Sequence, residues 1–595
     1  MKKAASNGIE RECPMRDRCG RTDTTMTHDI WGLVRSEFAR VDVNPRIDLA
    51  RAQKRMRHPN RVCTPEHLSA MKESALSFAA AMLRSQRDEQ WSICRRELNL
   101  DDVGRGEAYY ELNVGKCKSA FHVLSDYDAD ASREGRLADK YFDGRAVLFA
   151  RVPTAREREE QRQQITKLWD GRANENVLGW TLANRSVENV DQVVSSLEVG
   201  RQPDIGRWSP GRRYLLRNAG FYGNGKQGSR LWCTMTNDHP LKRPYFPEMI
   251  ALYMWREFGF DLVNHLSRVR GGISMSSDAK TSLGIGNSSG MGMVAVLTRW
   301  PWWVDAWTVT REVCRAVIGT MRPSEEPNLV QRFVSELDVR QKQFEEDAHQ
   351  STSEFIESPA SVAKQLTKVR KKIGSSVSIP GTADLQEVIF QYADEFLTPE
   401  ANESVSAAAI DAAPDIADCG FRAMSQLMEP VTYLDPRQEM SAFKEEVRRR
   451  YDWIELRDVV RESRQEYFWY KSSDNGEHRR GERGTDSGVE CEVLVDVASE
   501  VEALLMTCGE MPENVSVGQL LRDFPEYREI VERVHSLRRR DYGDIRDRCT
   551  RDGFLPLWVI RFYLTVLGLQ TTDPKNWRWV RGVFFRDAPL AARIE

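Results

Sequence analysis

Residues 109–124 read YYELNVGKCKSAFHVL, and this stretch carries most of the information on the fold class. The segments YYELNV and SAFHVL are rich in aromatic and β-branched residues, and the turn GKCK separates them, as in a β-hairpin. Residues 145–152 supply a third strand, which Pro153 ends. The sequence therefore predicts a small antiparallel sheet near residues 105–153.

Helical periodicity dominates the rest of the chain. After Thr64-Pro65, a good helix start, apolar residues recur at helical spacing through Met82. Residues 247–270 are apolar on more than one face, which is typical of a buried central helix. Residues 301–319 form a second strong helix. We therefore expect an α+β protein, predominantly α-helical, in which a large helical body carries the small sheet.

Composition shifts along the chain suggest its organisation. Polar and unpatterned stretches alternate with periodic ones, and no repeat of fixed period occurs. The expected segments are a flexible N-terminal segment (1–27), a helical and small-sheet region (28–200), a glycine-loop core region with the candidate site (201–322), a helical region (323–470), an exposed loop (471–490) and a C-terminal helical region (491–595).

The overall charge of the chain argues against several partners. Lys and Arg total 86 and Asp and Glu total 89, so no global field attracts nucleic acid or an acidic membrane. No apolar run approaches the roughly 18 residues that cross a bilayer, and no apolar stretch follows the basic N-terminus. The 11 cysteines are scattered, which fits a reducing compartment. We expect a soluble, cytoplasmic protein that binds neither nucleic acid nor membrane; its cofactor and oligomeric state stay open.

The run SLGIGNSSGMGM, residues 282–293, is the most unusual segment. Glycine permits close approach of a ligand to the main chain, and serine hydroxyls add donors for a phosphate or carboxylate. The run is locally similar to the phosphate loop of the GHMP small-molecule kinases but lacks that family's other motifs. The alternative is a tight turn that lets two helices pack closely. The candidate ligand-binding residues are Gly284, Gly286, Asn287, Ser288, Ser289 and Gly290.

A second glycine cluster, residues 217–230, precedes the first. Asn-Gly by itself is a hairpin-turn signal, but this segment is dense in side-chain N–H donors, which suit an anion. Its candidate ligand-binding residues are Arg217, Asn218, Asn224 and Lys226. A surface hairpin with solvated charges is the alternative. Because the two clusters flank the 247–270 helix, we expect them to line one cleft.

Histidine is scarce, with nine residues, so each is a candidate general base. Asp261 precedes His265 by four residues, which places both on one helix face, where a carboxylate orients an imidazole. His239 is the other candidate base. The alternative is that Asp261 and His265 have no catalytic role, because structural helices routinely contain an aspartate and a histidine four residues apart. No metal-ligand spacing occurs, so no metal is expected.

These features favour an enzyme that acts on an anionic small molecule, a carboxylate or a phosphate, held by glycine-rich loops. The reaction type is not encoded in any motif. The alternative is a non-catalytic ligand-sensing or scaffold protein whose helical surfaces bind a partner protein. A pocket with converging donors would favour the enzyme. An exposed aromatic patch would favour the scaffold.

Overall fold

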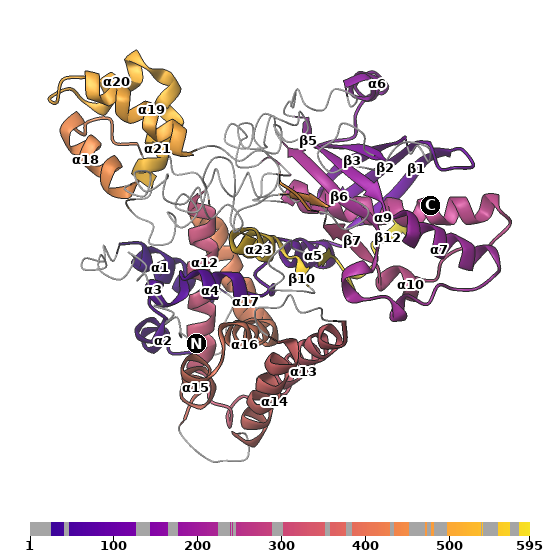
Figure 1. Ribbon diagram of the computed structural model, residues 1–595, viewed down its shortest axis with the longest axis horizontal. Helices are drawn as coiled ribbons and strands as arrows, with labels where there is room; N and C mark the ends of the chain where they lie inside the picture. The colour runs from indigo at the N-terminus through magenta and orange to yellow at the C-terminus, as the bar shows by residue number, and fades with distance from the viewer. Residues whose placement is uncertain are drawn as a thin grey trace, which may run out of the picture.

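Figure 1 shows the protein as a computed structural model. The structure describes residues 25–40, 47–126, 143–164, 176–223, 239, 241, 246–287, 301–350, 358–376, 383–428, 434–451, 470–472, 478–480, 497–536, 538, 557–571 and 582–594. Residues 25–27 of the expected N-terminal segment belong to the first helix. The described chain is α+β and largely helical, as expected.

The sheet is much larger than expected and mixed in direction. Ten strands follow the order β10-β11-β7-β6-β5-β4-β3-β2-β1-β12. The predicted hairpin is present, with Val114 opposite Cys117. The expectation of a small antiparallel sheet was wrong, because β1 pairs with β12, and β6 with β7, in parallel. The strands are β1 (Ser92–Leu100), β2 (Gly106–Val114), β3 (Cys117–Ser125), β4 (Gly144–Phe149), β5 (Val177–Arg185), β6 (Tyr214–Gly223), β7 (Gly284–Asn287), β10 (Gln570–Thr571), β11 (Gly582–Phe584) and β12 (Ala592–Ile594).

The additional strands have weak local signals. β1 reads SICRRELNL, and its charged middle is exposed, so it lacks regular alternation of apolar and polar residues. β5 reads VLGWTLANR, which also lacks alternation. The short strands β7, β11 and β12 each pair with a strand that lies far away in sequence: β7 with β6, β11 with β7, and β12 with β1. Strand formation depends on such cross-strand packing more than on intrinsic propensity.

The sheet curls around the central helix α9 (Phe246–Val269), as predicted for a helix that is apolar on several faces. Arg256 donates from Nε to the carbonyl oxygen of Leu283, just before β7, at 2.7 Å. Arg593 of β12 donates to Glu257 of the same helix at 2.7 Å. Strands β6 to β1 separate β7 from β12 in the sheet. Residues from strands at opposite ends of the sheet therefore contact α9, and nearly all side chains of this helix are buried.

The helical body lies beside the sheet in Figure 1 and shares one continuous apolar core with it. Helix α12 spans Pro301–Gly319, the range predicted from the sequence, and runs through the middle of this body. No helix in the described ranges is long and apolar enough to cross a membrane. The other helices of the body are α1 (Thr25–Arg40), α2 (Leu49–Arg55), α3 (Pro59–Val62), α4 (Pro65–Ala70), α5 (Phe78–Asp88), α13 (Pro327–Gln350), α14 (Pro359–Ser376), α15 (Gln391–Phe396), α16 (Pro399–Ala412), α17 (Pro414–Leu427) and α23 (Leu557–Leu567).

The helix predicted to run from Pro65 through Met82 is interrupted. Thr64 caps α4 as expected, but α4 ends at Ala70, and α5 begins only at Phe78. The linking backbone is held by other helices: the Trp307 indole donates to the carbonyl oxygen of Leu76 at 3.2 Å. Apolar periodicity continues through the break because the linker is also largely buried.

A second apolar core belongs to a small helical unit in the C-terminal third. Its helices are α18 (Met440–Arg450), α19 (Val497–Glu510), α20 (Val517–Asp523) and α21 (Arg528–Ser536). Three further helices flank the sheet: α6 (Ala155–Gln164), α7 (Val187–Glu198) and α10 (Ser277–Thr281). Strands β8 (Tyr470–Ser472) and β9 (His478–Arg480) form a separate ladder at the expected 471–490 loop.

Candidate functional site

The two glycine-rich segments begin side by side in the sheet. β6 and β7 are parallel neighbours, with Arg217 opposite Gly286 and Asn218 opposite Asn287. Their carboxyl ends therefore lie at the same edge of the sheet, where ligands bind in many open parallel sheets. The other residues proposed for this site, Asn224, Lys226, Ser288, Ser289 and Gly290, lie outside the described residues.

Strand alternation separates Arg217 from Asn218. The Trp255 indole of α9 donates to Thr181 Oγ1 at 3.3 Å, and Thr181 donates to Asn218 Oδ1 at 3.3 Å. Asn218 therefore faces the central helix. Arg217, one residue earlier, points to the opposite face of the sheet, since successive side chains alternate. These two candidate ligands cannot hold the same small group from one side.

The glycines of β7 have a packing reason in the structure. A Cβ on Gly286 would lie 2.8 Å from Arg217 Cγ and 2.8 Å from the Tyr214 ring. A Cβ on Gly284 would collide with the carbonyl oxygen of Phe584 in β11. Close approach of neighbouring side chains and backbone therefore explains both glycines without a ligand.

The expected acid–base pair on α9 is not a pair. Asp261 accepts hydrogen bonds from Arg95 at 2.9 Å and from the Tyr110 hydroxyl at 2.9 Å, and it also contacts Arg593. The His265 Nε2 lies 2.9 Å from the carbonyl oxygen of Asp101. Asp261 therefore joins the central helix to the sheet. His239 Nδ1 accepts a hydrogen bond from the Leu241 amide at 3.3 Å.

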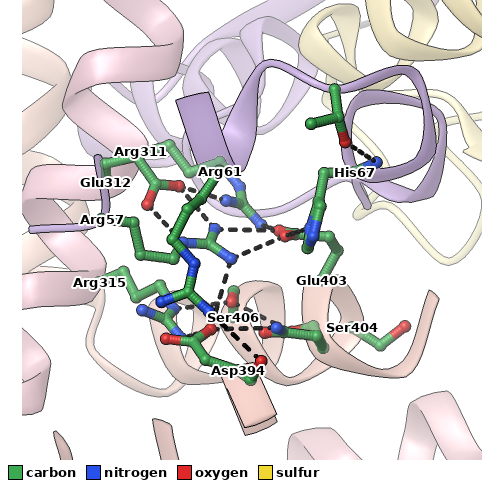
Figure 2. Close-up of polar contacts among 12 residues, drawn as sticks. Arg57, Arg61, His67, Arg311, Glu312, Arg315, Asp394, Glu403, Ser404 and Ser406 are labelled. Carbon is green, nitrogen blue, oxygen red and sulfur yellow. Dashed lines mark hydrogen bonds and ion pairs between the residues drawn. The ribbon is translucent and has the colours of Figure 1, made fainter. Parts of the chain in front are cut away.

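A group of buried charges that sequence reasoning missed lies in the helical body (Figure 2). Arg57, between α2 and α3, donates to Glu312 of α12 at 2.7 and 2.8 Å and to Glu403 of α16 at 2.8 Å. Arg311 contacts both carboxylates as well. Arg315 donates to Asp394 of α15 at 2.8 Å. We call these six residues, Arg57, Arg311, Glu312, Arg315, Asp394 and Glu403, the arginine–carboxylate network.

The network contains three cations and three anions, and each charge has a partner. Burial opposes ionisation of Glu403, but Arg311 and Arg57 outweigh this effect and hold its pKa well below the ordinary value. Burial lowers the pKa of Arg315 to about 10. Removing one member would strand a buried charge. The carboxylates of this network form ion pairs with arginines. No group of side chains that could hold a metal ion occurs among the described residues.

His67 lies where the network meets the surface. Its Nδ1 is 2.9 Å from Glu403 Oε1, and its side chain is 25% exposed, whereas Glu403 is fully buried. Thr64 caps α4 and accepts a hydrogen bond from the His67 amide at 3.3 Å, so the cap fixes the first helical turn that carries this imidazole. A carboxylate that contacts one imidazole nitrogen sets the tautomer and leaves the other nitrogen to act as a base. The partners lie 336 positions apart, so no local motif indicates the pair.

Glu248, in the first turn of α9, is a second buried group that the sequence analysis missed. Burial raises the pKa of its carboxyl to about 7. Its Oε2 has no hydrogen-bond partner among the described residues. It lies two turns before Trp255 and, at that helical spacing, on the same face of α9. A carboxyl of this kind changes its charge near neutral pH.

Comparison with known proteins adds no functional information. No protein-family model matches the chain, and neither a curated protein nor a solved structure matches it. Any assignment therefore depends on the side chains themselves.

Proposed function

We propose that the protein binds an anionic small molecule, a carboxylate or phosphate, at the β6–β7 edge of the sheet, and that it acts on this molecule as an enzyme. Arg217 would be the principal ligand. The observation that carries the proposal is its guanidinium: the Nε is buried and has no hydrogen-bond partner among the described residues. A buried donor without an acceptor is costly, and an anionic ligand would supply the acceptor.

The surroundings of Arg217 support this role. Among the described residues, no carboxylate lies within ion-pair distance of its guanidinium, whereas Arg212, just before β6, pairs with Glu188. The absence of a side chain at Gly286 leaves room for the stem of Arg217. An arginine fork suits bidentate binding of carboxylate or phosphate oxygens.

Isothermal titration with inorganic phosphate, pyrophosphate and succinate tests this proposal. Arg217→Met keeps the apolar stem and removes the charge, so the affinity for the anion that binds should fall by about 1.5–3 kcal/mol, the value of a charged hydrogen bond. Arg212→Met, at an exposed ion pair, is the matched control and should bind like the wild type. Equal affinity of the Arg217→Met variant and the control would reject Arg217 as the ligand.

A second candidate function, acid–base catalysis by His67, rests on a different observation. The 2.9 Å contact to an ionised, buried Glu403 orients the imidazole, and Arg61 is exposed close by, where it donates to the carbonyl oxygen of Asp394 at 3.4 Å. Such a pair would take a proton from water or a hydroxyl group next to an anionic substrate.

Hydrolysis of p-nitrophenyl acetate and p-nitrophenyl phosphate tests the second candidate. His67→Asn and Glu403→Gln should both reduce the rate, and His58→Asn, at an exposed histidine, should not. A wild type without activity, or an active His67→Asn variant, would reject this candidate.

A further inference from the structure

Helix α14 carries an unusual stripe of lysines. The helix has five basic residues and no acidic one. Its apolar residues, among them Val362, Leu366 and Val369, are buried against the helical body. Three of the exposed lysines are spaced by four residues (364, 368 and 372), and the fourth follows Lys368 by three, so all four lie on the side of the helix opposite its buried residues. They are Lys364, Lys368, Lys371 and Lys372, which we call the lysine stripe.

The lysine stripe lacks an ion-pair partner in the described part of the chain. The fifth cation of the helix, Arg370, pairs with Asp338 of α13. Among the described residues, no carboxylate lies within ion-pair distance of any lysine of the stripe. Most other basic side chains on the helical body have such a partner; Arg55 and Arg340 are examples. The four unpaired charges extend over about 12 Å, at 1.5 Å of rise per residue.

An exposed aromatic ring continues the stripe. Lys372 Nζ lies 5.3 Å from the centre of the Tyr392 ring in α15. The Tyr392 and Phe396 rings lie next to each other, with centroids 5.3 Å apart. Phe396 is 69% exposed, the most exposed aromatic side chain among the described residues. Helices α14 and α15 lie at the lower end of the helical body in Figure 1.

We propose that α14 and α15 form a binding surface for single-stranded nucleic acid, in which the lysine stripe contacts successive phosphates and Phe396 stacks on a base. Cations that follow a backbone, combined with an aromatic platform, are the physical requirements for such binding. A membrane surface fits less well, because the apolar face of α14 is packed inside the protein and cannot insert into lipid. A duplex fits less well, because its bases are paired and stacked and do not reach Phe396.

The balanced composition of the chain does not oppose this surface. Net charge describes the long-range field, whereas binding to a polyanion depends on which cations lack a partner in the folded protein. On α13 and α14, Arg340, Lys342 and Arg370 pair with carboxylates, and Arg332 donates to the carbonyl oxygen of Ala412, whereas the lysines of the stripe make no ion pair with a described carboxylate.

The test is fluorescence anisotropy of the full-length protein with labelled oligo-deoxythymidine and oligo-uridine of about 16 nucleotides, the upper site size of single-strand-binding modules. We expect micromolar affinity, and a slope of about −3 in a plot of log K against log salt, from about 0.7 per phosphate contact on single strands. Lys→Gln at all four positions of the stripe should bring the slope close to zero. Phe396→Ala should weaken binding about 5- to 150-fold with little change in slope, because it removes stacking and no charge.

The control variant neutralises four exposed arginines that already have carboxylate partners: Arg156→Gln, Arg207→Gln, Arg322→Gln and Arg528→Gln. It should bind like the wild type. The proposal is overturned if the stripe variant binds the oligonucleotides as the control does, or if no binding is detected at low salt. Preference for duplex DNA or for phosphatidylserine vesicles over the single strands would also overturn it. Circular dichroism of each variant verifies the helical content.

Discussion

Arg57 and Glu312 form a two-point ion pair inside the helical body, with Nε–Oε2 and Nη2–Oε1 distances of 2.7 and 2.8 Å. The two residues are 255 positions apart, and their side chains are almost fully buried. Through this pair the short N-terminal helices are attached to α12. Since the other Nη of Arg57 contacts Glu403, the same guanidinium also reaches α16.

Replacing Arg57 by Met should therefore destabilise the protein strongly. The change leaves Glu312 and Glu403 with excess buried negative charge, and breaking a buried pair costs about 3–5 kcal/mol. The free energy of unfolding from urea denaturation measures the loss. Arg156→Gln removes a fully exposed pair with Glu160, which solvent screens, and should leave the free energy of unfolding almost unchanged. A loss below about 1 kcal/mol for Arg57→Met would contradict the structural importance of the network.

Glu248 should make the protein less stable as the pH rises. Its pKa is about 7 in the folded state because burial disfavours the charge, and lower in the unfolded chain. Between these values the unfolded chain ionises first, so the free energy of unfolding falls by up to about 3 kcal/mol as the pH rises to 8. Glu248→Gln should lack this fall and match the wild type at acidic pH. Glu188→Gln, at an exposed position, is the control. Parallel pH profiles of the wild type and the Glu248→Gln variant would refute the assignment.

The small C-terminal unit should be sensitive to acid through His535. Burial lowers the pKa of this imidazole to about 4. Its Nδ1 accepts the Asp435 amide at 3.1 Å, so Nε2 carries the proton and donates to Gln438 at 2.7 Å. In the unfolded chain this imidazole takes up a proton near the ordinary histidine pKa of about 6.5. The free energy of unfolding of the unit is therefore at its full value above that pH.

As the pH falls from about 6.5 to about 4, the free energy of unfolding of this unit should decrease by up to about 3 kcal/mol. Hydrogen exchange of α18 and α21 at a series of pH values measures this loss. His535→Gln should flatten the profile, while His58→Gln, at an exposed histidine, should follow the wild type. An unchanged profile in His535→Gln would show that another group carries the acid sensitivity.

Gly286→Ala should destabilise the sheet by about 1–3 kcal/mol, because the added methyl group meets Arg217 and Tyr214 at 2.8 Å and overpacks the site. Gly374→Ala is the matched control: a Cβ there meets nothing within 4 Å, and alanine favours the helix by about 0.5–1 kcal/mol. In thermal unfolding, the midpoint temperature should therefore be lower than that of the wild type for Gly286→Ala and higher for Gly374→Ala. A Gly286→Ala protein as stable as the wild type would mean that Arg217 moves away freely.

Local chemistry was enough to predict several elements. The Thr64-Pro65 start of α4, the range of α12 and the β2–β3 hairpin are all present. Each depends on interactions between residues close in sequence: a side-chain cap, a proline at the first helical turn, or a short turn between two apolar segments. The central helix α9 was also predictable, because it is apolar on several faces and therefore needs burial on all of them.

The candidate sites were less accessible to sequence reasoning. Asp261 and His265 have the spacing of a catalytic pair, but Arg95, Tyr110 and the Asp101 carbonyl oxygen are their actual partners. His67 has no suggestive neighbour in sequence, yet it contacts Glu403. Hydrogen-bond partners are chosen by the packing of distant segments, which no short motif records.

The sequence by itself determined the helical character of the chain, many of its apolar core positions and the β2–β3 hairpin, because these follow from periodicity, caps and turns over a few residues. Only the tertiary structure decided the size of the sheet, the parallel pairing of β6 with β7, and which charges are neutralised. Strand pairing and ion pairing join residues hundreds of positions apart, as Arg57 and Glu403 do. Their free energy depends on burial, and burial exists only once the whole chain has folded.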